Sequence, residues 1–339
     1  MFLMQEIKKA ELPVLAIDLG GTNIFAAIIS SQGRVMARAC YLTLADEGSE
    51  AVINRIFLVI EDLLHQRSMK LCQLDSISIA TAGAIDFDKG LVTSSPHLPG
   101  WHDVPLRDIV GGKYKVKTFL INDANAAALG EHKFGAGQGV DNLIVLTVGT
   151  GIGGGIIVGG KLYSGASGSA GEIGHMTIDV SGPRCDCGND GCLEALVSGG
   201  AVAKEAIRRI RQGGSSSLTG VVGGKIENIT AEEVSIEAQD GDSLASEVIL
   251  QAATYLGIGL ASIVNIFNPE MIIIGGGMAK MGDLLLNPAR QVVRERAFQL
   301  PVRAVRIVPA QLGDDAGMLG AAVFAFQQKT KRGEYNEGS

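Results

Sequence analysis

The chain has 339 residues, 46% of them hydrophobic and 19% charged, which is enough for two domains with large cores. Its formal net charge of −7 argues against a nucleic-acid partner, which would need clustered Lys and Arg on one face. No uninterrupted apolar run reaches the ~18 residues of a membrane span, and the first 12 residues are too mixed for a signal peptide, so we expect a cytoplasmic protein that contacts no membrane.

The first part of the chain is predicted to contain two strands, a helix with apolar residues at helical spacing, two more strands and a second helix. In chain order these are Val14–Ile17, Ile24–Ser30, Ala51–Gln66, Ser76–Ala80, Lys117–Ile121 and Ala124–Glu131. Cys40 and Cys72 are expected to be ordinary core residues.

The second part is predicted to contain a strand, an amphipathic helix, a Gly- and Ser-rich mobile loop, a long apolar helix, two strands and an Ala-rich helix. In the same order these are Leu143–Val148, Glu194–Gln212, Gly213–Gly224, Ser243–Phe267, Met271–Ile274, Arg303–Pro309 and Gly317–Gln327. A capped helix start is expected at Thr230. Because strands and helices alternate, the class is α/β.

Two stretches share one design: an apolar strand, a turn of Gly and Thr, and a second apolar strand. They lie within Leu15–Ile29 and Leu146–Val158. Neither is a Walker loop or a dinucleotide fingerprint, because the Gly-Lys-Ser/Thr ending is missing and a strand follows the glycines. Glycine lets the backbone approach a ligand closely, and Thr or Asn adds donors. The pair predicts a nucleotide phosphate site, against the alternative of two ordinary tight turns; its residues would be Gly20, Gly21, Thr22, Asn23, Gly149, Thr150 and Gly151.

Asp18 ends the first of these strands, so a carboxylate stands where phosphates are expected. This arrangement is favourable with a cation between the charges, and Mg²⁺ binds few carboxylates together with phosphates. Asp18 is therefore a candidate Mg²⁺ ligand, and the alternative is a structural Asp that accepts from turn amides.

Three cysteines and a histidine form a candidate zinc set. Cys185, Cys187 and Cys192 lie within eight residues, and His175 precedes them by ten. Three thiolates and an imidazole make a closed tetrahedral site, so the zinc would be structural. A disulfide between Cys185 and Cys187 would be strained, which leaves free thiols as the alternative.

Four segments together resemble the ROK family of bacterial sugar kinases, and most of all its glucokinases. They are DLGGTN from Asp18, NDANAAALGE from Asn122, TVGTGIGGG from Thr147 and GEIGHMTID…CDCGNDGCLEALVSG from Gly171. The resemblance spans about residues 13 to 327. It implies a two-domain actin-like, ribonuclease-H-like ATPase fold with a cleft between the domains.

Domain bounds follow from this resemblance and from the repeated strand–turn–strand design. The expected N-terminal domain is 1–123, joined by the C-terminal helix 315–328. The expected second domain is 124–314 with the zinc-binding loop, and 329–339 is expected to be a disordered tail.

The resemblance also assigns roles to individual residues. Asp123 would be the general base that accepts the hydroxyl proton, whereas without the resemblance an N-cap role would be the simpler interpretation. The sugar would be bound by Gly83, Asn122, Asp123, Glu172, His175 and Glu194, and the nucleotide also by Gly275, Gly276 and Gly277. Trp101 would either cover a sugar face or anchor its loop in the core.

The expected activity is an ATP-dependent hexose kinase acting on the 6-hydroxyl of glucose, with ATP, Mg²⁺ and structural Zn²⁺ as cofactors and a homodimer as the assembly. The alternatives are kinases for N-acetylmannosamine, fructose, mannose or allose, and a sugar-responsive transcriptional repressor. We expect no repressor, because only about a dozen residues precede the first phosphate motif, too few for a helix-turn-helix domain.

Overall fold

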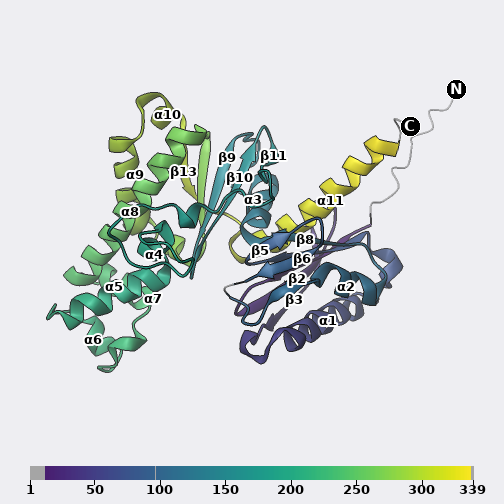
Figure 1. Cartoon of the computed structure of the whole chain (residues 1–339), viewed down its shortest axis with the longest axis horizontal. Coiled ribbons are helices and arrows are strands. Elements are labelled where there is room, and N and C mark those ends of the chain that lie inside the picture. The colour runs from purple at the N-terminus through teal and green to yellow at the C-terminus, as the bar shows by residue number, and fades with distance from the viewer. Residues whose placement is uncertain (1–11, 96, 337–339) are drawn as a thin grey trace. The chain divides into compact units, whose positions relative to one another are not determined.

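The computed structural model describes residues 12–95 and 97–336, which form two compact units (Figure 1). The first unit combines the described residues up to Phe134 with those from Asp314 onward, and the second is Gly135–Gly313. The first boundary differs from the one expected at residue 123, because helix α3 (Asp123–Phe134) packs mainly against the C-terminal helix α11 (Ala316–Asn336). Helix α3 therefore belongs to the first unit.

The first unit is built on a five-stranded sheet in the order β3-β2-β1-β4-β8. The strands are β1 (Val14–Leu19), β2 (Asn23–Ile29), β3 (Val35–Leu42), β4 (Ser76–Thr81) and β8 (Thr118–Asn122). β1 pairs antiparallel with β2 and parallel with β4, and β4 pairs parallel with β8. The carboxyl ends of β1, β4 and β8 therefore meet at one edge of the sheet.

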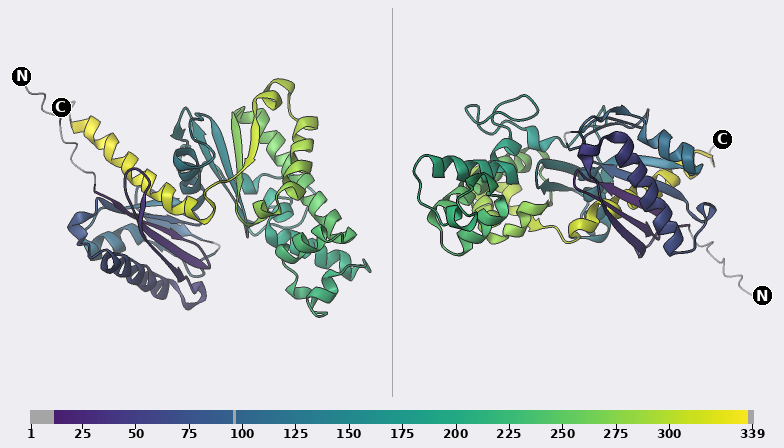
Figure 2. Two further views of the ribbon diagram at one scale, coloured as in Figure 1. Left: turned by 180° about the vertical axis from the view of Figure 1, so that it is seen from behind. Right: turned by 90° about the horizontal axis from the view of Figure 1, so that it is seen from below.

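Helices cover both faces of this sheet. Figure 2 shows α1 (Ser49–Gln66) on the face opposite α11, and α2 (Leu106–Tyr114) follows the small sheet β5-β6-β7. That small sheet consists of β5 (Ala84–Asp86), β6 (Leu91–Ser94) and β7 (His102–Val104). Trp101, between β6 and α2, is 1% exposed and joins the core, so it anchors its loop.

Cys40 and Cys72 were expected in the core, and this prediction is wrong. Both side chains are exposed. Cys40 lies in β3, the edge strand whose residues alternate between the two faces, and the alternation places Cys40 outward, next to the nearly buried Ala39.

The second unit repeats the plan with the strand order β11-β10-β9-β12-β13. The strands are β9 (Leu143–Val148), β10 (Ile152–Val158), β11 (Lys161–Leu162), β12 (Met271–Gly275) and β13 (Arg306–Pro309). The helices are α4 (Leu193–Val197), α5 (Gly199–Arg211), α6 (Leu218–Val221), α7 (Ala231–Gln239), α8 (Ser243–Phe267), α9 (Asp283–Arg296) and α10 (Gln299–Ala304). The predicted start of α7 is confirmed, because the Thr230 side chain accepts from the Glu232 N–H.

Helix α8 is the central helix of this unit. Among the described residues it is the only helix long and apolar enough to cross a membrane by length and composition, but 56% of that stretch is buried inside the protein. It packs against α9 and α7, and its side chains form much of the unit's core. The apolar composition of α8 is therefore explained by core packing.

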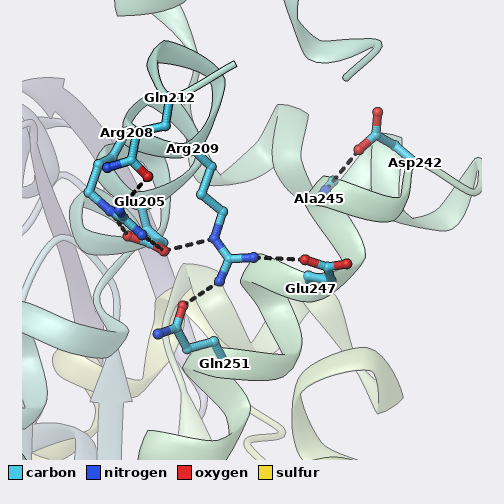
Figure 3. Close-up of polar contacts among 8 residues, drawn as sticks. All are labelled: Glu205, Arg208, Arg209, Gln212, Asp242, Ala245, Glu247 and Gln251. Carbon is cyan, nitrogen blue, oxygen red and sulfur yellow. Dashed lines mark hydrogen bonds and ion pairs between the residues drawn. The ribbon is translucent and has the colours of Figure 1, made fainter. Parts of the chain in front are cut away.

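Helices α5 and α8 are also joined by a polar network at the surface (Figure 3). The Arg209 guanidinium donates to Glu205 at 2.8 Å within α5, and across to Glu247 at 2.9 Å and Gln251 at 2.7 Å on α8. Arg208 forms two further hydrogen bonds of 2.7 Å to Glu205. One guanidinium thus fixes the register between the two helices.

Four secondary-structure predictions differ from the structure. The strand expected over Arg303–Pro309 begins only at Arg306, because Arg303 and Ala304 belong to helix α10. The single helix expected over Glu194–Gln212 is α4 and α5, because Ser198 interrupts the ladder and its Oγ accepts from Ala201 N–H at 3.3 Å. The loop expected at Gly213–Gly224 contains the short helix α6. Helix α11 continues to Asn336, past the end expected at residue 328, and the last three residues of the expected tail lie outside the described residues.

Candidate active site

Two carboxylates of the first unit lie at the shared edge of its parallel strands. Asp18 lies in β1 opposite Ala80 of β4. Asp123 directly follows β8, which pairs with the other side of β4. Only one strand therefore separates the two positions.

Burial and neighbouring charges disfavour ionisation at this edge. Burial first, and then the charges of Asp123 and Asp314, raise the pKa of Asp18 from 3.8 to about 7. Burial also raises the pKa of Asp123, against the Ala124 N–H, which donates to Asp123 Oδ1 at 2.8 Å, and the charge of His97. Carboxylates grouped in this way are stabilised by a cation or a shared proton. The donor set therefore fits Mg²⁺, which prefers carboxylate oxygen.

The helix cap next to Asp123 is provided by its neighbour. Asn122 Oδ1 accepts from Asn125 N–H at 3.1 Å, the three-residue spacing of an N-cap. Asp123 lies one residue inside the helix and accepts from the adjacent Ala124 N–H at 2.8 Å, so the cap is Asn122 and capping does not explain the position of Asp123. The Asn122 amide in turn donates to Gly83 O at 3.3 Å.

The glycine at position 83 is required by the backbone. Its φ of +103° is in the region that favours glycine, and a Cβ there would lie 2.2 Å from Ser94 O. Gly83 thus holds the Asn122 side chain through its carbonyl, and it belongs to the same edge as Asp123.

The first glycine turn is held by a strand end and a loop. Thr43 Oγ1 donates to Gly20 O at 2.7 Å, and Thr43 N–H donates to Thr22 O at 2.8 Å. A Cβ on Gly21 would lie 2.9 Å from the Cβ of His97. The turn is therefore fixed by Thr43 on one side and closely covered by His97 on the other.

The second glycine turn lies in the other unit. Gly149 N–H donates to Gly151 O at 2.9 Å, and Gly149 O accepts from Gly199 N–H, the first residue of α5, at 2.8 Å. Gly276 has φ +83°, and its Cβ would lie 2.4 Å from Val148 O. The structure thus brings the predicted nucleotide segments of this unit together at the ends of the paired strands β9 and β12. Glycine turns beside a helix N-terminus, which carries partial positive charge, suit phosphate oxygens.

The four predicted zinc ligands converge. Their ligand atoms all lie within 4.8 Å of one another. Cys185 Sγ is 3.8 Å from His175 Nδ1, and Cys187 Sγ is 3.6 Å from Cys192 Sγ. A tetrahedron with bonds of ~2.3 Å has edges of ~3.8 Å, so these separations fit zinc. A disulfide needs ~2.0 Å between sulfurs, and all three cysteines are free.

Three predicted sugar ligands surround this cluster. His175 directs Nδ1 toward Cys185 and Nε2 toward Glu172, whose Oε2 lies 3.9 Å away. Glu194 lies in the first turn of α4, beside the cluster. Its Oε2 accepts a hydrogen bond from Ile152 N–H at 2.7 Å. A metal on Nδ1 would therefore leave Nε2 and the Glu172 carboxylate available as a polar pair.

A cavity of about 540 Å³ adjoins the cluster within the second unit. It lies between the loop 179–186, helix α5 and helix α8, and Glu194 and Thr150 contribute to its wall. Glu172 and His175 do not line it. The cavity is therefore distinct from the predicted sugar contacts, except at Glu194.

The structure groups the predicted site residues within each unit. Asp18, Asn122, Asp123 and Gly83 lie at one edge of the first sheet, and the residues predicted to bind zinc and nucleotide in the second unit lie around β9, β10 and β12. How the groups from the two units act together stays a prediction. Sequence reasoning missed Thr43 and Asp314, because only the folded chain places these two near the motif residues. His97 stands out in the sequence beside the loop of Trp101, but only the fold shows that it covers Gly21.

Comparison with known proteins agrees with this arrangement. A family model described as the ROK family matches residues 14–328. The chain is 37% identical to a glucokinase of Thermotoga maritima over 315 residues, covering 92% of this chain and 96% of the relative. It is also 33% identical to a xylose repressor of Caldicellulosiruptor bescii, covering 98% of this chain and 83% of the relative.

The fold matches solved structures of the same family. A ROK family glucokinase from Streptomyces griseus, in complex with glucose and AMPPNP, has a TM-score of 0.81 and 34% identity, covering 93% of this chain and 99% of that chain. A ROK hexokinase from Thermus thermophilus has a TM-score of 0.78 and 35% identity, covering 94% and 99%. These structures have the actin-like sugar kinase fold that the motifs predicted, and the family model covers most of the chain. The chain belongs to the ROK family.

Proposed function

We propose that this protein is an ATP-dependent hexose kinase that phosphorylates the 6-hydroxyl of glucose. The observation that carries the proposal is the pair Asp18 and Asp123 at one edge of the first sheet, with the Asn122 cap leaving the Asp123 carboxylate for chemistry. The glucokinase relatives support glucose as the sugar and ATP as the donor.

In the proposed reaction the sugar oxygen attacks the γ-phosphorus in line, and the bond to the β-phosphate oxygen breaks to release ADP. Asp123 accepts the proton that leaves the 6-hydroxyl. Burial raises the pKa of Asp123, which makes it a better proton acceptor than an exposed carboxylate.

Asp18 would hold Mg²⁺, directly or through water, and the ion would neutralise charge on the phosphates. The backbone of the turns at Gly20–Thr22 and Gly149–Gly151 would bind the phosphate oxygens. The stretch Gly275–Gly277 would leave room for the nucleoside, because no side chain projects there.

Glucose selectivity would come from Glu172, His175 and Glu194, with Asn122 on the other unit. A carboxylate accepts from two hydroxyls, and charge-assisted hydrogen bonds are roughly twice as strong as neutral ones. Zinc on His175, Cys185, Cys187 and Cys192 would hold this loop in shape and take no part in the chemistry, since four protein ligands close its coordination shell.

The proposal includes a cytoplasmic homodimer. The reducing cytoplasm keeps thiolate ligands out of disulfides. Exposed apolar side chains at the end of α8 and around the start of α10 support a subunit contact: Ile266, Phe267, Phe298 and Leu300. Size-exclusion chromatography with light scattering tests the dimer.

A coupled ADP-release assay over a panel of hexoses, with ATP and Mg²⁺, tests the function. Glucose should give the highest kcat/KM, and Asp123→Asn should serve as the inactive control. Preference for N-acetylmannosamine, fructose, mannose or allose would replace glucose and keep the kinase. No ADP release with any sugar, together with sugar-dependent DNA binding, would favour a repressor and overturn the proposal.

A further inference from the structure

The carboxylate of Asp18 lies directly against the first turn of α11. A Cβ built on Gly317 would lie 2.1 Å from Asp18 Oδ2, 2.5 Å from Cγ and 3.1 Å from Oδ1. All three of the nearest atoms to that position belong to this one carboxylate. The φ of Gly317 is not in the region reserved for glycine, so the backbone alone does not require glycine here.

We propose that Gly317 is a positioning residue for Asp18, so that the metal-binding carboxylate is placed by a helix about 300 residues away in sequence. The inference rests on the proposed function and deepens it. Gly317 leaves the space that the carboxylate fills, and any side chain would push the carboxylate away from the helix. The first turn of an α-helix also carries partial positive charge, which favours a carboxylate at this place.

Helix α11 also packs very closely against α3, the helix that begins at Asp123. A Cβ on Gly320 of α11 would lie 1.6 Å from Ala126 O, and a Cβ on Gly130 of α3 would lie 2.5 Å from Ala316 O. The two backbones therefore touch at two points where neither helix tolerates a side chain.

This close packing links the two carboxylates of the site. Asp123 is the first residue of α3, and the first turn of α11 holds Asp18. Because Gly130 and Gly320 fix how the helices cross, they also fix the separation of the two helix N-termini. Gly130 and Gly320 therefore determine how closely the two helices pack, and Gly317 determines where the Asp18 carboxylate lies.

The test compares three glycine-to-alanine variants of the full chain. Gly317→Ala displaces the Asp18 carboxylate, Gly320→Ala disturbs helix packing, and Gly112→Ala in α2 is the matched control, because nothing lies within 4 Å of its Cβ position. Each variant is assayed for kcat, KM for glucose, the Mg²⁺ concentration at half-maximal rate, and Tm.

Gly317→Ala should lower kcat roughly 10- to 100-fold, since a misplacement of ~1 Å costs about 10²-fold in a positioned site. The Mg²⁺ concentration at half-maximal rate should rise several-fold, while KM for glucose stays within about twofold. Gly112→Ala should match the wild type. Gly320→Ala should lower Tm more than Gly317→Ala does, because its Cβ would meet backbone atoms and not the end of a side chain.

A wild-type kcat and Mg²⁺ midpoint in Gly317→Ala would overturn the inference. So would a loss that follows Tm alone and leaves the Mg²⁺ midpoint unchanged. A second readout needs no turnover: the rise in Tm that Mg²⁺ adds to ADP-bound protein should shrink in Gly317→Ala and persist in Gly112→Ala. If the wild type phosphorylates no sugar, the proposed function fails, and this Tm readout still decides the role of Gly317.

Discussion

Replacing Asp18 by Asn should stabilise the metal-free protein while it abolishes catalysis. The substitution keeps the size of the side chain and removes its charge. In the folded protein, burial and then the charges of Asp123 and Asp314 raise the pKa of Asp18 to about 7, against 3.8 for an ordinary aspartate. The folded state therefore binds the Asp18 proton more tightly than the unfolded state does.

The sign and size of the effect follow from these two values. The stability that this proton contributes is fully present below about pH 3.8 and is lost as the pH rises through about 7. At ~1.4 kcal/mol for each unit between the two pKa values, ionised Asp18 costs the metal-free protein at most about 4 kcal/mol above neutral pH. A domain of about this size gains roughly 2–4 °C in Tm per kcal/mol, so Asp18→Asn should raise Tm by up to about 15 °C.

Thermal melting in EDTA, followed by circular dichroism near pH 5 and near pH 8, measures this difference. The gap in Tm between Asp18→Asn and the wild type should be smaller near pH 5 than near pH 8, because at pH 5 only part of the stability contributed by the Asp18 proton has been lost. Near pH 8 the variant should melt higher, and its kcat with Mg²⁺ and ATP should be at least roughly 10²-fold lower. Asp88→Asn, at an exposed carboxylate of the same unit, is the control and should change neither property.

One result would refute this reasoning. If Asp18→Asn melts below the wild type at both pH values, the ionised carboxylate is stabilised by its surroundings, and the cost assigned to burial and to its acidic neighbours is absent.

Three further predictions concern the remaining site residues. Asp123→Asn should lower kcat roughly 10²–10⁴-fold with little change in glucose affinity by calorimetry, and near-normal turnover would remove Asp123 as the base. Elemental analysis should find about one zinc per chain, and Cys187→Ser should lose it with a lower Tm and weaker sugar binding; a metal-free protein with unchanged affinity would contradict this. Glucose should exceed galactose in kcat/KM about tenfold or more, because an inverted hydroxyl loses its hydrogen bond to a charged group, which contributes roughly 1.5–3 kcal/mol. Glu172→Gln should reduce that preference, and equal phosphorylation of both sugars by the wild type would exclude a hydroxyl-reading role for Glu172.

Local patterns were sufficient for the elements that carry strong periodicity or turn chemistry. Helix α1 and helix α8 occupy nearly the predicted ranges, because their apolar spacing continues until a clear stop. The convergence of His175, Cys185, Cys187 and Cys192 could be predicted from residue type and spacing, since the three cysteines lie on one short loop; that they bind zinc stays a prediction.

Contacts between distant segments could not be predicted in the same way. Gly317 looks like any small residue of an Ala-rich helix, and only the fold places it against Asp18. The split of the expected helix at Ser198 was also missed, because Ser is compatible with a helix interior as well as with a cap. The alternative interpretation made Asp123 the N-cap of α3, whereas the structure shows Asn122 in that role. The sequence does not distinguish the two, since Asn and Asp cap helices about equally well.

The position of α11 late in the sequence affects how the protein folds during its synthesis on the ribosome. The second unit is one continuous segment, so all of it has been synthesised before α11 begins. The first unit, although most of it is synthesised earlier, lacks the helix that packs on α3, β1 and β4 until α11 has left the ribosome. During synthesis the sheet of the first unit therefore has an apolar face that no helix yet covers. Chaperone binding to the growing chain should concentrate on that unit.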